Sequence, residues 1–427
     1  MDRNYQEGPD YPKFLDNNDP LGHFRQRFYV KKDVIYMCGN SLGLASKEAD
    51  ECTQKAMDLW KEEGIKIWNY DNSKYFLYSD YLARMMAPIV GADANEIAVV
   101  SSTTVNIHQV ISTFYKPTET RYKILVDDIN FPTDRYVVDS QVMLKGYDPK
   151  DAVKIVSPYN GKFMDEDEII NNMTPDVAVV FLPTVYYRTA QILDMDKITK
   201  VAKERGIVIG WDLCHAVGAI EINLTDLDAD FAVWCTYKYL NGGPGSAAAL
   251  YINKRHFQML PGMFGWYGNK TETQFALNQE FEHQQDASGW QLGSPTVASM
   301  ASLEGALKIF CEAGMGDIRK KSLHITGYLM FLIEAKLLKY GFSIGNFKED
   351  SKRGGHVCLE HDEAYKISIT LKKRGVVPDF RPPNVIRLAP VALYNTYQEV
   401  YDLVEILLNV VKTGSYKEVG DNRPLVV

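Results

Sequence analysis

The segment Trp234-Cys235-Thr236-Tyr237-Lys238-Tyr239-Leu240-Asn241-Gly242-Gly243-Pro244-Gly245 decides how this chain is interpreted. An apolar run at residues 231–234 leads into polar residues and one lysine. A loop with three glycines follows, so flexible backbone can approach a ligand closely beside Lys238. Most lysines near strand ends are solvated charges, but a lysine placed in this way is also a candidate to form a Schiff base.

Two more polar residues follow an apolar run upstream of this segment. The run covers residues 206–211, and Asp212 and His215 come after it. A carboxylate, a histidine and then a lysine one strand later is the order found in enzymes that bind pyridoxal 5'-phosphate (PLP), where the acid pairs with the pyridine nitrogen and the lysine binds the aldehyde. Asp212 could instead cap a helix, and His215 could form a structural hydrogen bond. The order favours a PLP site around Lys238.

The composition is that of a globular protein, and it limits the function. Of 427 residues, 46% are hydrophobic and 24% are charged, so we expect two or three domains, or one large and one small. The net charge of −8 and the lack of a basic run argue against binding to nucleic acid or to an anionic membrane. The apolar runs are of strand length, and the polar start at residues 1–7 predicts no secretory signal.

Cysteine spacing and short motifs exclude several kinds of site. The cysteines are Cys38, Cys52, Cys214, Cys235, Cys311 and Cys358. They form no CxxC pair and no metal-binding spacing, so we expect free thiols in a reducing compartment, the cytoplasm, and no metal site. The sequence also lacks GxGxxG, Walker A, HExxH and GxSxG motifs.

Short apolar runs that alternate with helical patterns predict the fold class. An amphipathic helix is predicted at residues 194–205. Near-continuous apolar strands separated by such helices predict an α/β fold with a mostly parallel sheet covered on both faces. The runs with the length and composition of buried strands are residues 96–100, 122–126, 177–182, 207–211, 231–234 and 247–252.

The pattern changes in the last third of the chain. Residues 297–337 are predicted to form one or two long helices, and residues 396–412 a final amphipathic helix. Between them, residues 356–360 and 366–371 alternate in polarity, which predicts half-exposed segments. This pattern indicates a smaller α+β domain.

Two domains are therefore expected. The large, PLP-binding domain is predicted at residues 46–300. The small domain is predicted to combine residues 1–45 with residues 301–427.

Hydroxyl groups and an aromatic ring follow two of the predicted strands. Thr103 and Thr104 precede a helix-like segment, and hydroxyls and free amides at a helix N-terminus bind anions such as a cofactor phosphate. Phe131 could stack on a pyridine ring, and Asp134 could accept a hydrogen bond beside it. The alternatives are a simple N-cap cluster in the first case and a β-turn in the second.

Three positions further along the chain could also contact ligands. Trp266 lies in a turn-like segment that either exposes aromatic residues or packs as a loop. Ser294 precedes the long helices, and its hydroxyl could reach a phosphate. Arg387 is a lone cation in an apolar run, where either a substrate carboxylate or an internal ion pair would satisfy the guanidinium.

Together these residues resemble the kynureninase family, PLP-dependent hydrolases of the aminotransferase-like fold type I (class V) superfamily. The resemblance implies a fold type I PLP-dependent transferase-like α/β architecture, with a mostly parallel, seven-stranded type of sheet in the large domain. It runs from Tyr36 to Asn395 and rests on the stretches CGNSLGL, TVNIH, FPTD, GWDLCHAVG, WCTYKYLNGGPG, GWYGN and RLAPVALYN.

The resemblance also implies roles for single residues. Lys238 and Tyr237 would be catalytic, and Trp266 and Ser294 would reach the phosphate from the partner subunit of a homodimer. The cofactor-binding residues it implies are Thr103, Thr104, Phe131, Asp134, Asp212, His215, Tyr237, Lys238, Trp266 and Ser294. The substrate-binding residues it implies are Asn40, Ser41, Trp68 and Arg387, with Arg387 on the α-carboxylate.

The implied reaction is hydrolysis of L-kynurenine to anthranilate and L-alanine, and of 3-hydroxykynurenine to 3-hydroxyanthranilate, in tryptophan catabolism and NAD biosynthesis. The stretch around Trp68 departs from relatives that carry a histidine there, so another β-acyl amino acid is an alternative substrate. The chain could also be a cysteine desulfurase-like enzyme, or a non-enzymatic homologue that serves as a binding protein.

Overall fold

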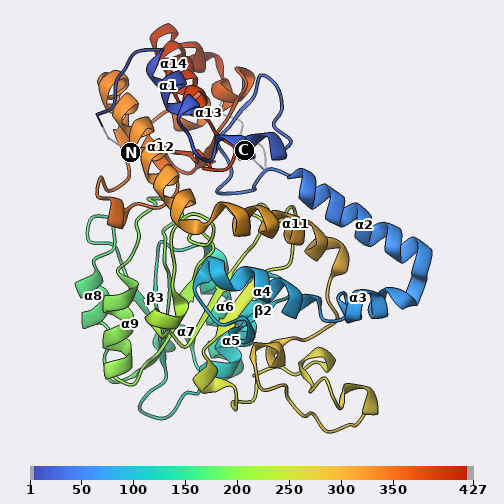
Figure 1. Cartoon of the computed structure of the whole chain (residues 1–427). Helices are drawn as coiled ribbons and strands as arrows, with labels where there is room; N and C mark the ends of the chain where they lie inside the picture. The colour runs from blue at the N-terminus through green and yellow to red at the C-terminus, as the bar shows by residue number, and fades with distance from the viewer. Residues whose placement is uncertain (1–3, 421–427) are drawn as a thin grey trace.

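A seven-stranded sheet lies at the centre of the larger part of the molecule (Figure 1). The structure, a computed structural model, describes residues 4–420. Strands β3 to β7 pair in parallel, and β8 is antiparallel to both of its neighbours. The mostly parallel sheet predicted from the sequence is confirmed. In order across the sheet, its strands are β2 (Ile97–Val99), β8 (Ala249–Ile252), β7 (Phe231–Trp234), β6 (Val208–Asp212), β5 (Val177–Pro183), β3 (Lys123–Asp127) and β4 (Val153–Val156).

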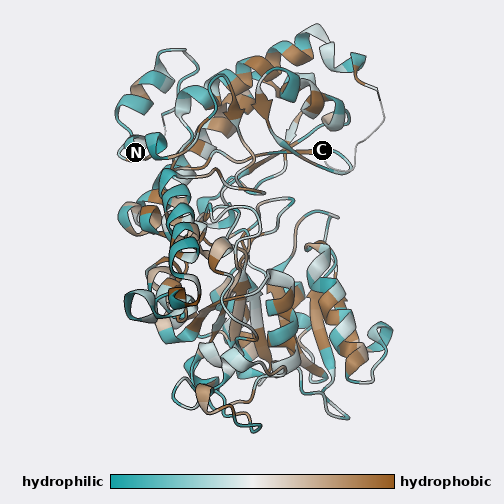
Figure 2. Cartoon of the chain, turned by 90° about the vertical axis from the view of Figure 1, so that its right-hand side faces the viewer, coloured by the Kyte–Doolittle hydropathy of each residue, from teal (hydrophilic) through white to brown (hydrophobic). Residues whose placement is uncertain are grey.

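Helices cover both faces of this sheet because its strands are apolar on both sides. Successive residues alternate between two cores, so Leu125 belongs to one core and Ile124 to the other. Figure 2 shows the strands as largely hydrophobic, with polar residues on the outer helices. Helices α4 (Tyr78–Val90) and α9 (Met195–Glu204) pack on one face, and α5 (Thr103–Phe114) and α6 (Pro132–Leu144) on the other.

The smaller part is built on a second sheet with its own core. Helices α12 (Met315–Lys336), α13 (Ala364–Lys373) and α14 (Tyr397–Thr413) supply much of that core, and α1 (Tyr11–Asn17) lies beside α14 (Figure 1). A short parallel pair joins β1 (Ile35–Tyr36) to β11 (Val376–Val377). The strands of the second sheet, in order, are β12 (Asp379–Arg381), β13 (Val385–Leu388), β10 (Val357–Glu360) and β9 (Ser343–Ile344).

Two long helices connect these parts. Helix α2 (Lys47–Glu63) lies along α11 (Val297–Ala313), with Gly305 directly against the backbone of α2 (Figure 1). Four short helices complete the helical elements named here: α3 (Tyr70–Ser73), α7 (Pro149–Ala152), α8 (Glu166–Asn171) and α10 (Leu224–Leu227).

The predicted elements can be compared with the observed ones. All six predicted strands of the large sheet are present, but β4 was not predicted. The half-exposed segment at residues 366–371 is instead the largely buried middle of helix α13. The two-domain division stays a proposal, because the first core also contains Phe24, Phe28 and much of α11, which fall partly outside residues 46–300.

Residues 4–420 bear on the predictions about membrane helices, metal sites and free thiols. Among residues 4–420, no helix is long and apolar enough to cross a membrane, and no group of three or more His, Cys, Asp or Glu side chains is arranged to bind a metal. All six cysteines lie in this range as free thiols.

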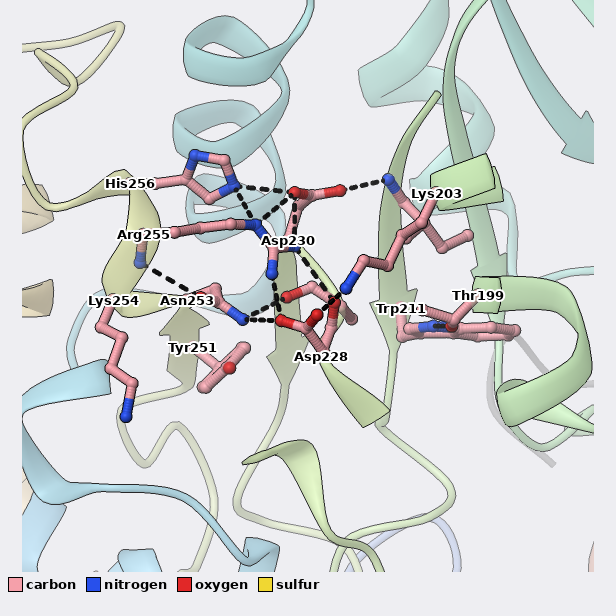
Figure 3. A network of polar contacts seen from close by, with 12 residues as sticks. Thr199, Lys203, Trp211, Asp228, Asp230, Tyr251, Asn253, Lys254, Arg255 and His256 are labelled. Atoms are coloured by element: carbon pink, nitrogen blue, oxygen red, sulfur yellow. Dashed lines mark hydrogen bonds and ion pairs between the residues drawn. The ribbon is translucent and has the colours of Figure 1, made fainter. Parts of the chain in front are cut away.

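A dense polar cluster surrounds the start of β7 (Figure 3). We call Asp228, Asp230, Asn253, Arg255 and His256 the amino-end cluster. Asp230 accepts hydrogen bonds from the Ile209 amide (2.8 Å), Arg255 Nη2 (2.7 Å) and, at 2.7 Å, from His256 Nε2. These bonds tie the starts of β6, β7 and the segment after β8 to one another.

Candidate active site

A cavity of about 220 Å³ lies at the opposite edge of the sheet, where β3, β5, β6 and β7 end. In parallel sheets this carboxyl edge is where ligands bind. Of the predicted site residues, all but Trp68, Trp266 and Ser294 line this cavity. Those that line it are Asn40, Ser41, Thr103, Thr104, Phe131, Asp134, Asp212, His215, Tyr237, Lys238 and Arg387.

Lys238 and His215 are in direct contact at the centre of the cavity. Lys238 Nζ lies 3.1 Å from His215 Nε2. Burial and the positive charge of Lys238 hold the pKa of His215 well below its usual value, so the imidazole is neutral. Nε2 then accepts the hydrogen bond from Lys238, and the ring proton sits on Nδ1, a buried atom without a partner among residues 4–420.

Two carboxylates face the same space from different strands. Asp212, at the end of β6, accepts a hydrogen bond from the Cys214 amide at 2.8 Å. Asp134, in the first turn of α6, accepts one from Asn130 Nδ2. Burial and the charge of Asp212 raise the pKa of Asp134 well above its usual value. The neutral, protonated form of the Asp134 carboxyl is therefore favoured.

The start of α5 supplies an anion-binding wall. Ser102 caps the helix, and Thr103 and Thr104 form its first turn, where backbone amides have no partner within the helix. Thr104 Oγ1 lies 3.3 Å from Thr133 Oγ1, which extends the hydroxyl cluster to α6. Phe131 is 47% exposed in the opening and contacts Tyr187 edge-on. This arrangement suits a phosphate next to an aromatic ring.

The N-terminal segment closes against the loop that carries Lys238. The Gly43 amide donates to the Tyr237 carbonyl at 2.8 Å, and a Cβ at position 43 would lie 2.5 Å from the Lys238 carbonyl oxygen. The preceding Asn40 is fully buried, and neither atom of its side-chain amide has a partner in the described chain. Burial raises the pKa of Tyr237 to about 12, so its phenol stays protonated at neutral pH.

Arg387 enters the cavity from β13 of the smaller part. It is 1% exposed, donates to the Tyr187 carbonyl at 2.9 Å and to Ser41 Oγ at 2.9 Å, and forms an ion pair with Asp379. The internal ion pair, one of the two possibilities that the sequence left open, is therefore present. Its partner Asp379 was not predicted, because it lies on the neighbouring strand, directly opposite Arg387 in the register.

Three predicted residues lie away from the cavity in the same chain. Trp68 lines a separate apolar groove with Trp60 and Ile65. Trp266 is 46% exposed and lines a surface pocket, and Ser294 is exposed. Trp266 and Ser294 therefore do not line the cavity of their own chain, and their role on a partner subunit stays a prediction.

The cavity also contains residues that sequence reasoning missed. Asn130 and Thr133 flank or fall within the FPTD motif, and Cys214 lies between Asp212 and His215, so proximity to these motifs could have indicated them. No local pattern marks the others. The missed lining residues are Asn130, Thr133, Val185, Tyr187, Cys214 and Arg381.

These groups fit PLP. Lys238 offers an amine for the aldehyde, Asp212 a carboxylate for the pyridine nitrogen, and the start of α5 hydroxyls and amides for the phosphate. His215 Nδ1 and the Asn40 amide are buried polar groups left without partners by the residues that the structure describes. Buried polar groups in native proteins are nearly always bonded, so these two point to a polar ligand.

Comparisons with known proteins agree with this chemistry. The family model described as "Kynureninase C-terminal domain" matches residues 318–407, and that described as "Cys/Met metabolism PLP-dependent enzyme" matches residues 69–259. A kynureninase from Bacillus anthracis is 48% identical over 99% of both chains. A kynureninase from Geobacillus thermodenitrificans is 46% identical over 98% of this chain and 97% of its own.

Solved structures match the fold. A cysteine desulfurase from Thermococcus onnurineus gives a TM-score of 0.77 at 15% identity, covering 92% of this chain and 98% of that one. A cysteine desulfurase from Escherichia coli gives 0.75 at 18% identity, covering 93% and 99%. These likenesses confirm the fold type I architecture.

Proposed function

This chain belongs to the kynureninase family, and from that membership we propose that it hydrolyses L-kynurenine to anthranilate and L-alanine. It is a PLP-dependent hydrolase acting on a carbon–carbon bond. The observation that carries the proposal is the single cavity that joins Lys238, Asp212 and His215 to the buried Arg387. 3-Hydroxykynurenine, which would give 3-hydroxyanthranilate, is the second candidate substrate, and tryptophan catabolism and NAD biosynthesis are the proposed pathways.

The residues at the cofactor end prepare the cleavage. When bound, PLP supplies an electron sink that stabilises negative charge at the substrate Cα. Asp212 keeps the pyridine nitrogen protonated, and Lys238 binds the aldehyde. The Lys238 amine, once free, takes the proton from Cα. The neutral His215 accepts a hydrogen bond from Lys238 without competing for that proton, because its pKa is held so low.

Water supplies the remaining atoms of the reaction. Its addition to the γ-carbonyl carbon is followed by breakage of the Cβ–Cγ bond, which releases anthranilate as the acid and leaves Cβ to be protonated to L-alanine. We assign the proton transfers of these later steps to Tyr237, whose phenol is protonated and lines the cavity.

Substrate binding is assigned to the end of the cavity near the smaller part. Arg387 would bind the α-carboxylate, since its guanidinium suits a planar anion, and Ser41 lies 2.9 Å from it. Asn40 offers an amide without a partner among residues 4–420. An aryl-binding role for Trp68 requires a second chain, because Trp68 does not line this cavity.

We propose that the active unit is a homodimer with shared active sites. Its support is the apolar groove of about 490 Å³ lined by Trp60, Ile65 and Trp68, in which Ile65 is 82% exposed. Mixing Lys238→Ala subunits with Trp266→Ala/Ser294→Ala subunits tests the sharing. Activity that returns on mixing supports it, since one of the two sites would then be intact. A mixture as inactive as its parts, with exchange shown by gel filtration of tagged subunits, would reject it.

The cytoplasm is the proposed location. The six free thiols support a reducing compartment.

Two competing functions are less well supported. Cysteine desulfurases need a cysteine on a mobile loop, whereas Cys311 lies in helix α11 and Cys358 is buried in strand β10. A non-enzymatic homologue would not need the Lys238–His215 contact beside Asp212. Purified protein without bound PLP would revive the non-enzymatic function.

Fluorescence of released anthranilate tests the proposed function. Purified holoenzyme is given L-kynurenine, with 3-hydroxykynurenine and other β-acyl amino acids in parallel assays and Lys238→Ala as the inactive control. Product from kynurenine supports the proposal. Product only from another β-acyl amino acid would move the assignment to that substrate, and no product from any would overturn the proposed reaction.

A further inference from the structure

A single carboxylate oxygen accepts hydrogen bonds from three side chains at the substrate end of the cavity. Asp379 Oδ2 accepts from Ser41 Oγ at 2.5 Å, from Arg381 Nη2 at 3.1 Å and from Arg387 Nη2. Asp379 is 5% exposed and Arg387 1%. Converging donors of this kind are typical of a carboxylate site, and here the carboxylate belongs to the protein itself.

The hairpin between β12 and β13 creates this arrangement. Asp379 lies directly opposite Arg387 in the antiparallel register, and Arg381 follows two residues later on the same strand, so its side chain is on the same face of the sheet. Both arginines line the cavity, although only Arg387 was predicted from the sequence.

The charges at this end do not balance. Two guanidinium groups carry two positive charges, and Asp379 supplies one negative charge, so one positive charge remains. The Nε atoms of both Arg381 and Arg387 are buried and have no partner among residues 4–420. The cluster therefore has both the charge and the open donors for one more carboxylate.

We propose that Asp379 is a specificity-determining residue that limits this end of the site to substrates with one carboxylate. It neutralises one of the two arginines and holds Arg387 in place, so a monocarboxylate amino acid balances the remaining charge. A second carboxylate on the substrate would be left without a counter-ion in a partly desolvated space. This inference rests on the proposed function, in which Arg387 binds the α-carboxylate.

Binding of two amino acids to the holoenzyme tests the inference. L-alanine carries one carboxylate and L-aspartate two, and isothermal titration calorimetry gives a Kd for each. We expect the wild type to favour L-alanine. Asp379→Asn keeps the side-chain size and removes the charge, so the ratio of the two Kd values should move toward L-aspartate by about tenfold.

Two further variants make the charge argument specific. Arg381→Gln removes a positive charge, and should move the ratio away from L-aspartate by about threefold or more. Asp379→Asn/Arg381→Gln restores one net positive charge, and its ratio should return to within about threefold of the wild type. Recovery in the double variant would not follow from mere damage to the fold.

Each outcome either supports or overturns the proposed role of Asp379. A ratio in Asp379→Asn that stays within threefold of the wild type, or no detectable L-aspartate binding by that variant, would overturn the inference. If Asp379→Asn does not fold, the shift in Arg381→Gln decides alone, and an unchanged ratio there overturns it. These are binding measurements, so an enzyme that failed to cleave kynurenine would reject the proposed substrate and leave this result interpretable.

Discussion

Polar groups lie at both ends of strand β7, but the two ends differ in how many of their buried polar atoms have hydrogen-bond partners. At its start, Asp230 binds the Ile209 amide, Arg255 and His256, and no side chain of the amino-end cluster is among the buried groups of residues 4–420 that lack a partner. Beyond its other end, His215, Asn40 and Arg387 all keep buried polar atoms without partners in that range.

The difference distinguishes polar groups that stabilise the fold from polar groups that bind a ligand. A polar cluster in which every buried group is hydrogen-bonded fixes the ends of strands and needs no ligand. Buried polar groups without partners are costly, so those that line a cavity point to a ligand that completes their hydrogen bonds. We therefore expect substitutions of residues that line the cavity to change activity, and substitutions in the amino-end cluster to change stability.

The largest effect is expected from Lys238→Ala. Loss of the amine that binds the cofactor and moves the Cα proton should lower kcat by about 10⁴-fold or more. The near-visible absorption of lysine-bound PLP should disappear as well. An unchanged absorption band would show that another residue binds the aldehyde.

Asp212→Asn should have the next largest effect. An amide cannot hold the proton on the pyridine nitrogen, so we expect kcat to fall by about a hundredfold, while PLP stays bound through Lys238. Steady-state kinetics and the absorption spectrum give the two readouts. A variant with wild-type kcat would remove Asp212 from the mechanism.

Asp230→Asn tests the opposite end of the strand. It replaces a carboxylate that accepts hydrogen bonds from three residues, so the free energy of unfolding should fall by about 2–4 kcal/mol with kcat per folded enzyme unchanged. Although burial raises the pKa of Asp230, the bonds from His256, Ile209 and Arg255 outweigh it and hold that pKa below 3.8.

The sign of the pH dependence follows from that shift. A carboxyl whose folded-state pKa lies below its unfolded value stabilises the fold above the unfolded pKa, and this contribution is lost as the pH falls through the folded pKa. Thermal unfolding should therefore show the Asp230→Asn defect at pH 7 and a smaller defect below about pH 4. Equal defects at both values would contradict the linkage.

Asp127 at the end of β3 should behave in the reverse way. Burial raises its pKa to about 7, and its Oδ2 has no partner among residues 4–420. The charged form is thus disfavoured in the fold, and stability is lost as the pH rises from the unfolded pKa through the folded one. Asp127→Asn should increase the free energy of unfolding by about 1–2 kcal/mol at pH 8 and by less at pH 5. Destabilisation at pH 8 would contradict this.

The smallest effect is expected from Lys254→Ala, next to the amino-end cluster (Figure 3). Lys254 is exposed, and its ion pair with Asp93 is long, at 3.4 Å. Exposed pairs of this kind contribute less than about 0.5 kcal/mol, so the unfolding midpoint should stay within error of the wild type. This variant is the matched control for Asp230→Asn.

The sequence was sufficient for the features that depend on local pattern. Continuous apolar runs marked the buried strands, and β7 was predicted with its observed bounds. Strand β4 was missed because it is at the edge of the sheet, where Lys154 and Ile155 are partly exposed and the apolar run is broken. Most of the candidate site could be predicted from the sequence, because its residues come directly after strands, at one edge of a parallel sheet.

The wrong or missing predictions concern features that depend on contacts between residues far apart in the sequence. Residues 366–371 alternate in polarity, but Ala364, Ile367 and Leu371 also share a helical face, and burial of that face in the second core selects the helix. Asp379 and Arg387 meet only through strand pairing, so no spacing along the chain revealed the pair. Trp68 was assigned from the family resemblance alone, and the groove that it lines depends on contacts that the sequence does not reveal.

The contact of Gly43 with the Lys238 loop has a consequence for mutational scanning. A Cβ at position 43 would overlap both Asn241 and the Lys238 carbonyl, and backbone cannot move aside as a flexible side chain can. In a deep mutational library selected for activity, position 43 should thus tolerate as few replacements as position 238, although it bears no reactive group. Invariance at position 43 in such data would reflect the packing of two loops and not a chemical role. A selection for folding alone distinguishes the two causes, because it should still exclude alanine at position 43 but accept alanine at position 238.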